Sequence, residues 1–337
     1  MGRSLREFWV LGLAFCFLVI ASTADAVAQR LTADQEGRVE FAAPNFDTFG
    51  QFQKNAPTSS GKASVDIHFP SGEGPFPAVI VSHTVGGWSD AVEGEAVRRL
   101  LAAGYTTAGL DHFGPRGIRS AATGGFGTAT AISDALIALK LLATHRKIDL
   151  QRIAIVGFSM GGMVAYLTAF EPLAVRFVGR EGPRFAAHVI FYGPCTGVAF
   201  DGATAMTTAP VLLLYGTKDE TTAPDKCDQM EHLVREVQPG VSIRTVRYEG
   251  AYHAWNQPQF QPPQFHSQAR NTRACPLIDV GSTYNLIAAD GSRGPITAEV
   301  FSECIRRSAG YTMGYDRATT DASWAEMVTF LDVALKR

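Results

Sequence analysis

The sequence predicts an α/β fold in which a mostly parallel central sheet is covered by helices on both faces. Short continuous apolar runs, of the kind buried inside a sheet, alternate along the chain with stretches of helical periodicity. Strands that are separated by crossover helices form parallel sheets. The 337 residues, with 46% hydrophobic and 18% charged content, are also enough to bury a sizeable core.

The predicted elements follow one another in a regular order. The first part, from about residue 39 to 55, is polar and mixed, and we expect an entry segment that wraps onto the main body. Strands are predicted at 63–69, 78–83, 105–111, 152–159, 186–193, 210–216 and 242–250. Helices are predicted at 91–104, 128–144, 225–237 and 321–335, and one more begins at Met160.

One long segment, residues 256 to 310, breaks this rhythm. It begins rich in Gln and Pro, and it carries Cys275 and Cys304. A stretch of this length inside a compact domain is usually a functional loop, a small subdomain or a disordered insertion. We interpret it as an insertion in a single domain that covers residues 29–337, with a bond between Cys275 and Cys304 as one way to staple it.

The N-terminus has the three-part pattern of a secretory signal peptide. Arg3 and Arg6 precede an apolar run over residues 8–20, and small residues follow with cleavage expected after Ala26 or Ala28. The alternative is an uncleaved anchor, but the apolar run is short for a bilayer span of about 20 residues. We therefore expect residues 1–28 to be removed, the chain to be exported to the periplasm or medium, and no stable membrane insertion afterwards.

Removal of this leader leaves four cysteines, namely Cys195, Cys227, Cys275 and Cys304. An even number in an exported chain is compatible with two disulfides, for which the sequence allows three pairings, and free buried thiols are the alternative. Their spacing does not indicate a metal site. The formal net charge of −2 indicates no nucleic acid or anionic membrane as partner and favours a neutral or small substrate.

The motif "GFSMGG" at 157–162 is the strongest chemical signal. A buried strand reaches Ser159 and a helix leaves at once, which forces the serine into a strained turn that needs small neighbours such as Gly157 and Gly161. The N–H of Met160 would lie at the helix N-terminus, where a free donor can stabilise an oxyanion. The alternative is an ordinary corner between a strand and a helix.

A serine nucleophile needs a base, and the base needs an orienting carboxylate. His253 fits best as base because it follows a late predicted strand in the loop "AYHAW", and His266 in the insertion is the alternative. Asp219 follows the apolar strand "APVLLLYG", where the order Ser, Asp, His places the acid. Glu220 is adjacent but one residue further from the strand end.

A second oxyanion donor should come from the loop after an early central strand. The stretch "VSHTVGG" occupies that place, and the N–H of Thr84 or Val85 could point into the site because two glycines allow close approach. We expect His83 to orient this loop by hydrogen bonds. After the next strand, His112 or Arg116 could lie at the rim, although a structural ion pair or turn explains Arg116 equally well.

With these residues assembled, the chain resembles the dienelactone hydrolase branch of the α/β-hydrolase family. The stretches that carry the resemblance are "FPAVIVSHTVGG", "DHFGPRG", "IDLQRIAIVGFSMGG", "APVLLLYGTKDE" and "GAYHAW". The resemblance implies an α/β-hydrolase fold with Ser159 as nucleophile, Asp219 as acid and His253 as base. It also implies backbone donors at Met160 and at the turn of Thr84 and Val85.

The sequence departs from that branch at several points. The namesake enzymes use cysteine where this chain has Ser159, and many relatives have glycine where it has Thr84. The insertion after His253 is a further difference and is a candidate lid or specificity element. These departures favour general ester or lactone hydrolysis of a small substrate through a serine acyl-enzyme, with no metal or organic cofactor. The alternatives are a secreted serine peptidase of the same fold and a non-catalytic binding protein on this scaffold.

Overall fold

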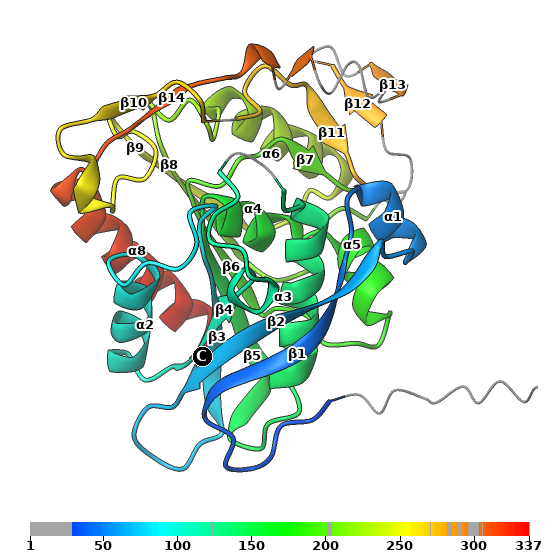
Figure 1. Cartoon of the computed structure of the whole chain (residues 1–337), viewed down its shortest axis with the longest axis vertical. Helices are drawn as coiled ribbons and strands as arrows, with labels where there is room; N and C mark the ends of the chain where they lie inside the picture. The colour runs from blue at the N-terminus through cyan, green and yellow to red at the C-terminus, as the bar shows by residue number, and fades with distance from the viewer. Residues whose placement is uncertain are drawn as a thin grey trace, which may run out of the picture.

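The computed structural model describes most of the chain (Figure 1). It covers residues 29–122, 125–200, 204–269, 271–281, 285–288, 292–295, 303–304 and 306–336. The predicted signal peptide, residues 1–28, lies outside the described residues, so its removal remains a prediction.

The centre of the molecule is an eight-stranded sheet with the strand order β1-β2-β4-β3-β5-β6-β8-β9. The strands are β1 (Gly37–Asn45), β2 (Ser59–His68), β3 (Phe76–Ser82), β4 (Thr106–Asp111), β5 (Ile148–Phe158), β6 (Ala187–Phe191), β8 (Val211–Gly216) and β9 (Ile243–Tyr248). All neighbouring pairs from β4 to β9 are parallel, whereas β1 and β2 are antiparallel to their neighbours. The predicted fold class is confirmed.

Helices cover both faces of this sheet (Figure 1). They are α1 (Phe49–Lys54), α2 (Glu93–Ala102), α3 (Thr128–Leu142), α4 (Met160–Leu167), α5 (Glu171–Val178), α6 (Pro224–Val237) and α8 (Arg317–Leu335). Side chains of α2 and α8 pack in one apolar core with Val79 and Val81 of β3, and those of α3 to α6 pack in another with Ala78 and Ile80. Successive residues of a central strand thus serve opposite faces, which explains why the strands read as continuous apolar runs.

The N-terminal entry segment contains a strand that the sequence analysis did not predict. Strand β1 pairs with β2 along its whole length, and Val39, Phe41 and Ala43 are buried while the residues between them are exposed. The alternation is short in the sequence, because only Val39 and Phe41 alternate with charged residues and the following Ala42, Ala43 and Pro44 show no contrast between the two faces. Helix α1 follows, and Thr48 caps it.

The insertion contains short strands beside the main sheet. Strands β11 (Leu277–Asp279), β12 (Asn285–Ile287) and β13 (Arg293–Pro295) form a small sheet, to which the main body contributes β7 (Gly197–Val198). A separate pair consists of β10 (Gln264–His266) and β14 (Tyr311–Met313), the latter at the end of the insertion. Figure 1 shows these elements above the carboxyl ends of the central strands.

Two disulfides are present, and they decide between the three pairings that the sequence left open. Cys195 is bonded to Cys227, and Cys275 is bonded to Cys304 inside the insertion, with Cα atoms 4.9 Å apart in both pairs. Within the described part of the chain, no helix combines the length and the hydropathy needed to span a bilayer.

The bond between Cys195 and Cys227 should contribute measurably to stability. The two residues are 32 positions apart, and closing a loop of this size lowers the entropy of the unfolded chain. We expect the Cys195→Ala/Cys227→Ala double variant to lose about 3 kcal/mol of unfolding free energy. Urea unfolding followed by circular dichroism measures this loss. The same denaturation midpoint for wild type and variant would contradict the expectation.

Candidate active site

Ser159 lies at the turn between β5 and α4, in a backbone conformation that few residues adopt. Its φ of 54° and ψ of −109° are outside the ordinary regions for an L-residue, and such strain costs on the order of 1–3 kcal/mol. The turn closes because its neighbours lack side chains. A Cβ on Gly157 would come within 1.9 Å of the Gly161 carbonyl oxygen, and one on Gly161 within 2.1 Å of the Ser82 carbonyl oxygen.

His253 follows β9 and reaches back to this serine. Its Nε2 is 2.9 Å from the Oγ of Ser159, and its ring is buried. The next residue, Ala254, has a φ of 60°, in the left-handed region that few residues other than glycine adopt. The carbonyl of His253 accepts a hydrogen bond of 3.0 Å from the N–H of Gly314, so the end of the insertion supports this loop.

Asp219 completes a hydrogen-bonded chain of three side chains. Its Oδ2 is 2.8 Å from Nδ1 of His253 and also accepts the hydroxyl of Thr222 at 2.7 Å. Its Oδ1 accepts the backbone N–H groups of Thr221 and Thr222 at 2.8 and 2.9 Å. Because both oxygens of Asp219 act as acceptors for neighbouring N–H and O–H groups, Nδ1 of His253 is the donor toward Oδ2, which leaves Nε2 as the acceptor for the serine hydroxyl.

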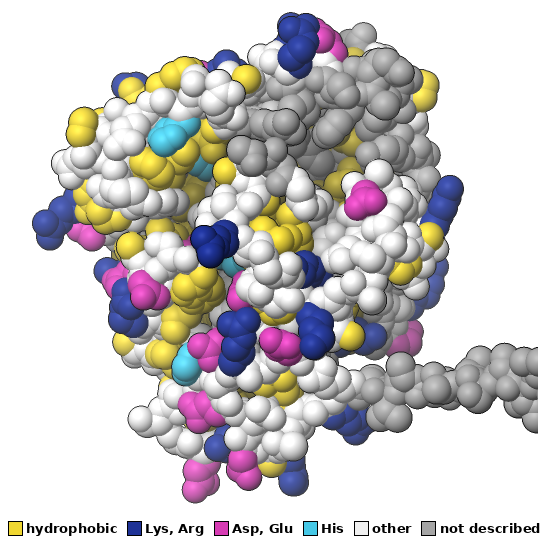
Figure 2. Space-filling model, in the orientation of Figure 1, with side chains coloured by type: hydrophobic (Ala, Val, Ile, Leu, Met, Phe, Trp, Pro, Cys, Tyr) yellow, Lys and Arg dark blue, Asp and Glu magenta, His cyan; other side chains and the backbone are white. Residues whose placement is uncertain are grey.

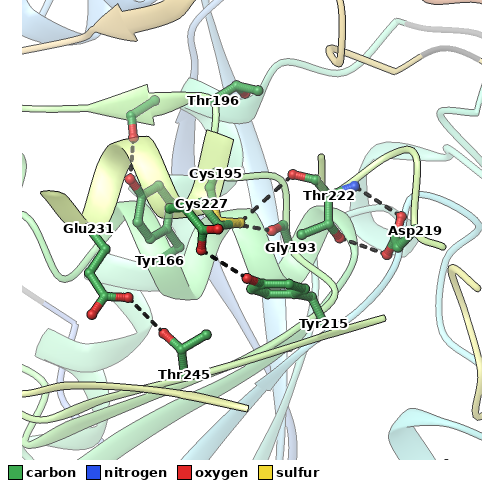
Figure 3. The surroundings of a disulfide bond; sticks show 12 residues. Tyr166, Gly193, Cys195, Thr196, Tyr215, Asp219, Thr222, Cys227, Glu231 and Thr245 are labelled. Carbon is green, nitrogen blue, oxygen red and sulfur yellow. Dashed lines mark hydrogen bonds between the residues drawn. A yellow bond between two sulfur atoms is a disulfide. The ribbon is translucent and has the colours of Figure 1, made fainter. Parts of the chain in front are cut away.

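A disulfide holds the acid loop in place (Figure 3). The acid loop is the segment 217–223 between β8 and α6, which carries Asp219. Cys227 lies in the first turn of α6, directly after this loop, and its Sγ is 3.8 Å from the carbonyl oxygen of Thr222. Its partner Cys195 lies in the loop after β6, next to Gly193. In Figure 3 the bonded pair lies beside Thr222, whose hydroxyl faces Asp219. The disulfide therefore joins the acid loop to the segment that follows β6.

Neither of the two alternative residues is part of the hydrogen-bonded chain, although His266 lines the same pocket as Ser159. Glu220, the neighbour of Asp219, pairs with Arg273 at the surface, away from the ring of His253. His266 is on β10 in the insertion, where it packs edge-on against Phe260. The structure thus brings Asp219 and His253, rather than the alternatives, to Ser159.

The geometry decides between the two candidates for the second oxyanion donor. The backbone N–H of Thr84 already donates to Oε1 of Glu93 at 3.0 Å, so the prediction that Thr84 supplies the donor is wrong. Val85 is left as the candidate from this loop, and it lines the same pocket as Ser159. Met160 is the first residue of α4, where a backbone N–H has no acceptor within the helix.

Glu93 is buried and holds the loop between β3 and α2, residues 83–92, at two points. This loop is called the oxyanion loop below. Besides Thr84, its other oxygen accepts the N–H of Ser89 at 2.9 Å. Burial raises the pKa of Glu93 to about 7, and the two hydrogen bonds oppose this shift. His83 holds the same loop: burial lowers its pKa to about 3, and its neutral ring contacts the carbonyl of Thr84 at 2.7 Å. This agrees with the orienting role expected for His83.

A second chain of polar side chains is buried beneath the loop. The Oγ of Ser82 is 2.9 Å from Nε2 of His112, whose Nδ1 is 2.9 Å from Asp134. Arg116 binds both oxygens of Asp134, at 2.8 and 2.9 Å. These side chains are buried, so the rim position considered for His112 and Arg116 is wrong and the structural ion pair is correct. A buried charge is retained where such a partner compensates it.

Ser159, Met160 and His253 open onto a pocket of 750 Å³ between the main body and the insertion. Figure 2 shows hydrophobic side chains gathered below the β10–β14 pair, with histidine side chains among them. The apolar lining includes Val85, Phe126, Met160, Met163, Phe260, Phe265 and Met313. Apart from His253 and His266, the described residues that line the pocket have apolar or uncharged polar side chains. No group of three or more His, Cys, Asp or Glu side chains in the described residues is arranged to hold a metal ion.

Comparisons with known proteins agree with this architecture. Residues 66–276, more than half of the chain, match the sequence model of the dienelactone hydrolase family. YtaP of Bacillus subtilis, a predicted hydrolase, is 25% identical, over 50% of this chain and 69% of its own length. A predicted carboxymethylenebutenolidase of Methylorubrum extorquens is 27% identical, over 56% of this chain and 66% of its own.

Solved structures share the fold. A dienelactone hydrolase-like promiscuous phosphotriesterase from metagenomic libraries superposes with a TM-score of 0.54 and 17% identity, over 88% of this chain and 99% of its own. At this identity the likeness concerns the fold alone.

Several residues at the site were not predicted from the sequence. Thr222, Glu93, Tyr192 and Tyr311 are polar or aromatic residues in segments with no motif of their own. The sequence offered one signal for Glu93: it is an acidic residue at the start of the helix that follows the glycine-rich loop. Its burial depends on how that loop folds back over the helix.

The raised pKa of Glu93 predicts a pH dependence of stability. Between pH 4.5 and 7 the folded chain keeps a proton on Glu93 that the unfolded chain has released. The free energy of unfolding therefore falls as the pH rises through this interval, and the loss from this group is on the order of 3 kcal/mol. Urea titrations at both ends of the interval measure it, and Glu93→Gln should lack this component.

Glu95→Gln is the matched control for that measurement. Glu95 lies on the same helix but is half-buried and paired with Arg98 and Arg99, so its removal should leave the wild-type pH dependence in place. If Glu93→Gln loses as much stability over the interval as wild type does, Glu93 is not the titrating group.

Proposed function

Because the chain belongs to the dienelactone hydrolase family and is a hydrolase of that fold, we propose that it cleaves ester or lactone bonds through a serine acyl-enzyme. One observation carries the proposal: Ser159, His253 and Asp219 form an unbroken hydrogen-bonded chain whose serine end opens onto a pocket. A serine hydroxyl becomes a nucleophile when a base takes its proton.

The first step is attack of the Ser159 oxygen on the carbonyl carbon. Nε2 of His253 accepts the serine proton at the observed distance of 2.9 Å, and Asp219 stabilises the imidazolium through the Nδ1–H hydrogen bond. The backbone N–H groups of Met160 and Val85 hold the oxyanion of the tetrahedral intermediate.

Collapse of the intermediate breaks the bond to the alcohol oxygen, which takes the proton from Nε2 of His253. Water then attacks the acyl-enzyme: His253 accepts a proton from the water and returns it to Ser159 as the acid leaves. This sequence balances its protons without a metal ion or an organic cofactor. The strained turn at Ser159 serves it by presenting Oγ to the pocket before substrate arrives.

The chemistry of the pocket supports an uncharged acyl group. Val85, Phe126, Met160 and Met163 are apolar side chains around the serine, and such a wall favours an aliphatic or aromatic group over a carboxylate. An ionised acyl group that enters this pocket loses hydration, and the described lining residues include no Lys or Arg side chain that could pair with its charge.

We also propose that the protein is exported, as the pattern of residues 1–28 predicts. The two disulfides support this proposal, because such bonds form and persist in the periplasm and outside the cell and are rare in the cytosol.

Removal of the nucleophile tests the proposed mechanism. We expect Ser159→Ala to lose at least about a thousandfold in kcat/KM on p-nitrophenyl butyrate, as loss of a nucleophile does in enzymes of this type. A serine-directed fluorophosphonate should label wild type once, at Ser159, and mass spectrometry of the digest locates the label.

Ser82→Ala is the control, because Ser82 also bonds a histidine but is buried away from the pocket. It should still be labelled. Equal turnover by wild type and Ser159→Ala would exclude the mechanism. Hydrolysis of peptide p-nitroanilides but of no ester would indicate a peptidase.

A matched pair of substrates tests the uncharged acyl group. p-Nitrophenyl butyrate and mono-p-nitrophenyl succinate share a leaving group and a four-carbon acyl chain, but the succinate ester ends in a carboxylate. We expect kcat/KM to be at least about tenfold higher for the butyrate, because an unpaired charge is costly to bury. Equal values for the two esters would contradict the expectation.

A further inference from the structure

The insertion ends against the histidine of the site. Strand β14 (Tyr311–Met313) runs past His253, forms an isolated parallel bridge with it through Met313, and continues to the Gly314 N–H that binds the carbonyl of His253. Segments more than fifty residues apart in sequence thus form one local structure. The loop of His253 is held on one side by the main body and on the other by the end of the insertion.

The ring of His253 contacts two tyrosine rings. Tyr192, which follows β6, meets it edge-on with ring centroids 4.9 Å apart, and Tyr311 of β14 meets it edge-on at 5.3 Å. Both tyrosines are buried. Two hydrogen bonds fix the directions of the imidazole nitrogens, and the contacts with the two tyrosine rings limit how far the imidazole can tilt.

The position of Tyr311 is fixed by bonds that cross the base of the insertion. The N–H of Gly310 donates to the carbonyl of Ala269 at 2.8 Å, and the side chain of Asn271 donates to the carbonyl of Gly310 at 3.2 Å. The N–H of Ala274 donates to the hydroxyl of Ser308 at 2.9 Å, next to the disulfide at Cys275. The last residues of the insertion are therefore tied to an inner part of it, at Ala269, Asn271 and Ala274, directly before β14 begins.

We propose that Tyr311 is a positioning residue that keeps the imidazole of His253 aimed at Ser159. The proposal rests on the proposed function, because it assigns Tyr311 a part in the proton transfer by His253. The part of Tyr311 that acts is its aromatic ring, which packs against the imidazole and restrains it.

The surroundings of Tyr311 suit this part. Burial, together with the charge of Asp219, raises the pKa of Tyr311 to about 12, so its phenol stays neutral beside the histidine. A neutral ring restrains the imidazole without adding a charge that would compete with Asp219. A proton-transfer geometry is sensitive to such restraint, since a misplacement of about 1 Å can cost about a hundredfold in rate.

Three variants at one position separate ring packing from other roles. We expect Tyr311→Ala to lower kcat on p-nitrophenyl butyrate between about tenfold and a hundredfold. The change in KM should be smaller, because Tyr311 is one lining residue among many and the apolar side chains of Val85, Phe126, Met160 and Met163 still line the pocket. Tyr311→Phe keeps the ring and should restore kcat to within about threefold of wild type, well above the alanine variant. If Tyr311→Ala fails to fold by circular dichroism, Tyr311→Leu fills the volume without the ring and should show the same loss.

Tyr315→Ala is the matched control. Tyr315 follows on the same segment, is half-buried and is not among the pocket-lining residues, so its removal should leave kcat near wild type. Wild-type kcat in Tyr311→Ala would overturn the proposal. So would an equal loss in Tyr311→Phe and Tyr311→Ala, because the hydroxyl rather than the ring would then be responsible.

A second readout does not depend on turnover. Proton NMR in water should show a downfield Nδ1–H signal from the hydrogen bond of His253 to Asp219 in wild type and Tyr311→Phe, and the signal should broaden or vanish in Tyr311→Ala. If wild type neither hydrolyses esters nor reacts with the fluorophosphonate, the proposed function fails, while this signal still reports on positioning. A signal of equal width in all three proteins would overturn the positioning role.

Discussion

The close approach of backbone around Ser159 is the constraint on which the rest of the site depends. The turn between β5 and α4 brings the carbonyls of Ser82 and Gly161 to positions where any side chain on Gly161 or Gly157 would collide. Because the strand is buried between β3 and β6, the turn cannot relax outward. Ser159 therefore keeps its strained conformation, and the cost is met by the packing of the two elements that it joins.

Every other part of the site is held against that turn by polar groups that are themselves buried. Asp219 is saturated by hydrogen bonds from its own loop, and Glu93 binds two N–H groups of the oxyanion loop. The chain from Ser82 through His112 to Asp134 and Arg116 lies beneath. Such groups are costly to bury unless each finds its partner, and this cost makes one arrangement of the loops much more stable than its alternatives.

Covalent bonds act where hydrogen bonds alone would leave a long loop free. One disulfide joins the start of α6, next to the acid loop, to the segment after β6, and the other closes the insertion that returns to His253. The insertion has little regular structure of its own among the described residues, and its short strands pair with the main body or with each other.

The sequence by itself determined the parallel sheet, the elbow at Ser159 and the order in which Ser159, Asp219 and His253 occur, because these follow from local periodicity and from the residues that a tight turn requires. It did not determine strand β1, whose apolar positions have meaning only when β2 lies beside them. Only the tertiary structure decided that the backbone N–H of Thr84 donates to Glu93, that Cys195 pairs with Cys227 and that Tyr311 packs on His253. Each of these is a contact between segments distant along the chain, and such contacts are set by how the layers pack rather than by the pattern within any one segment.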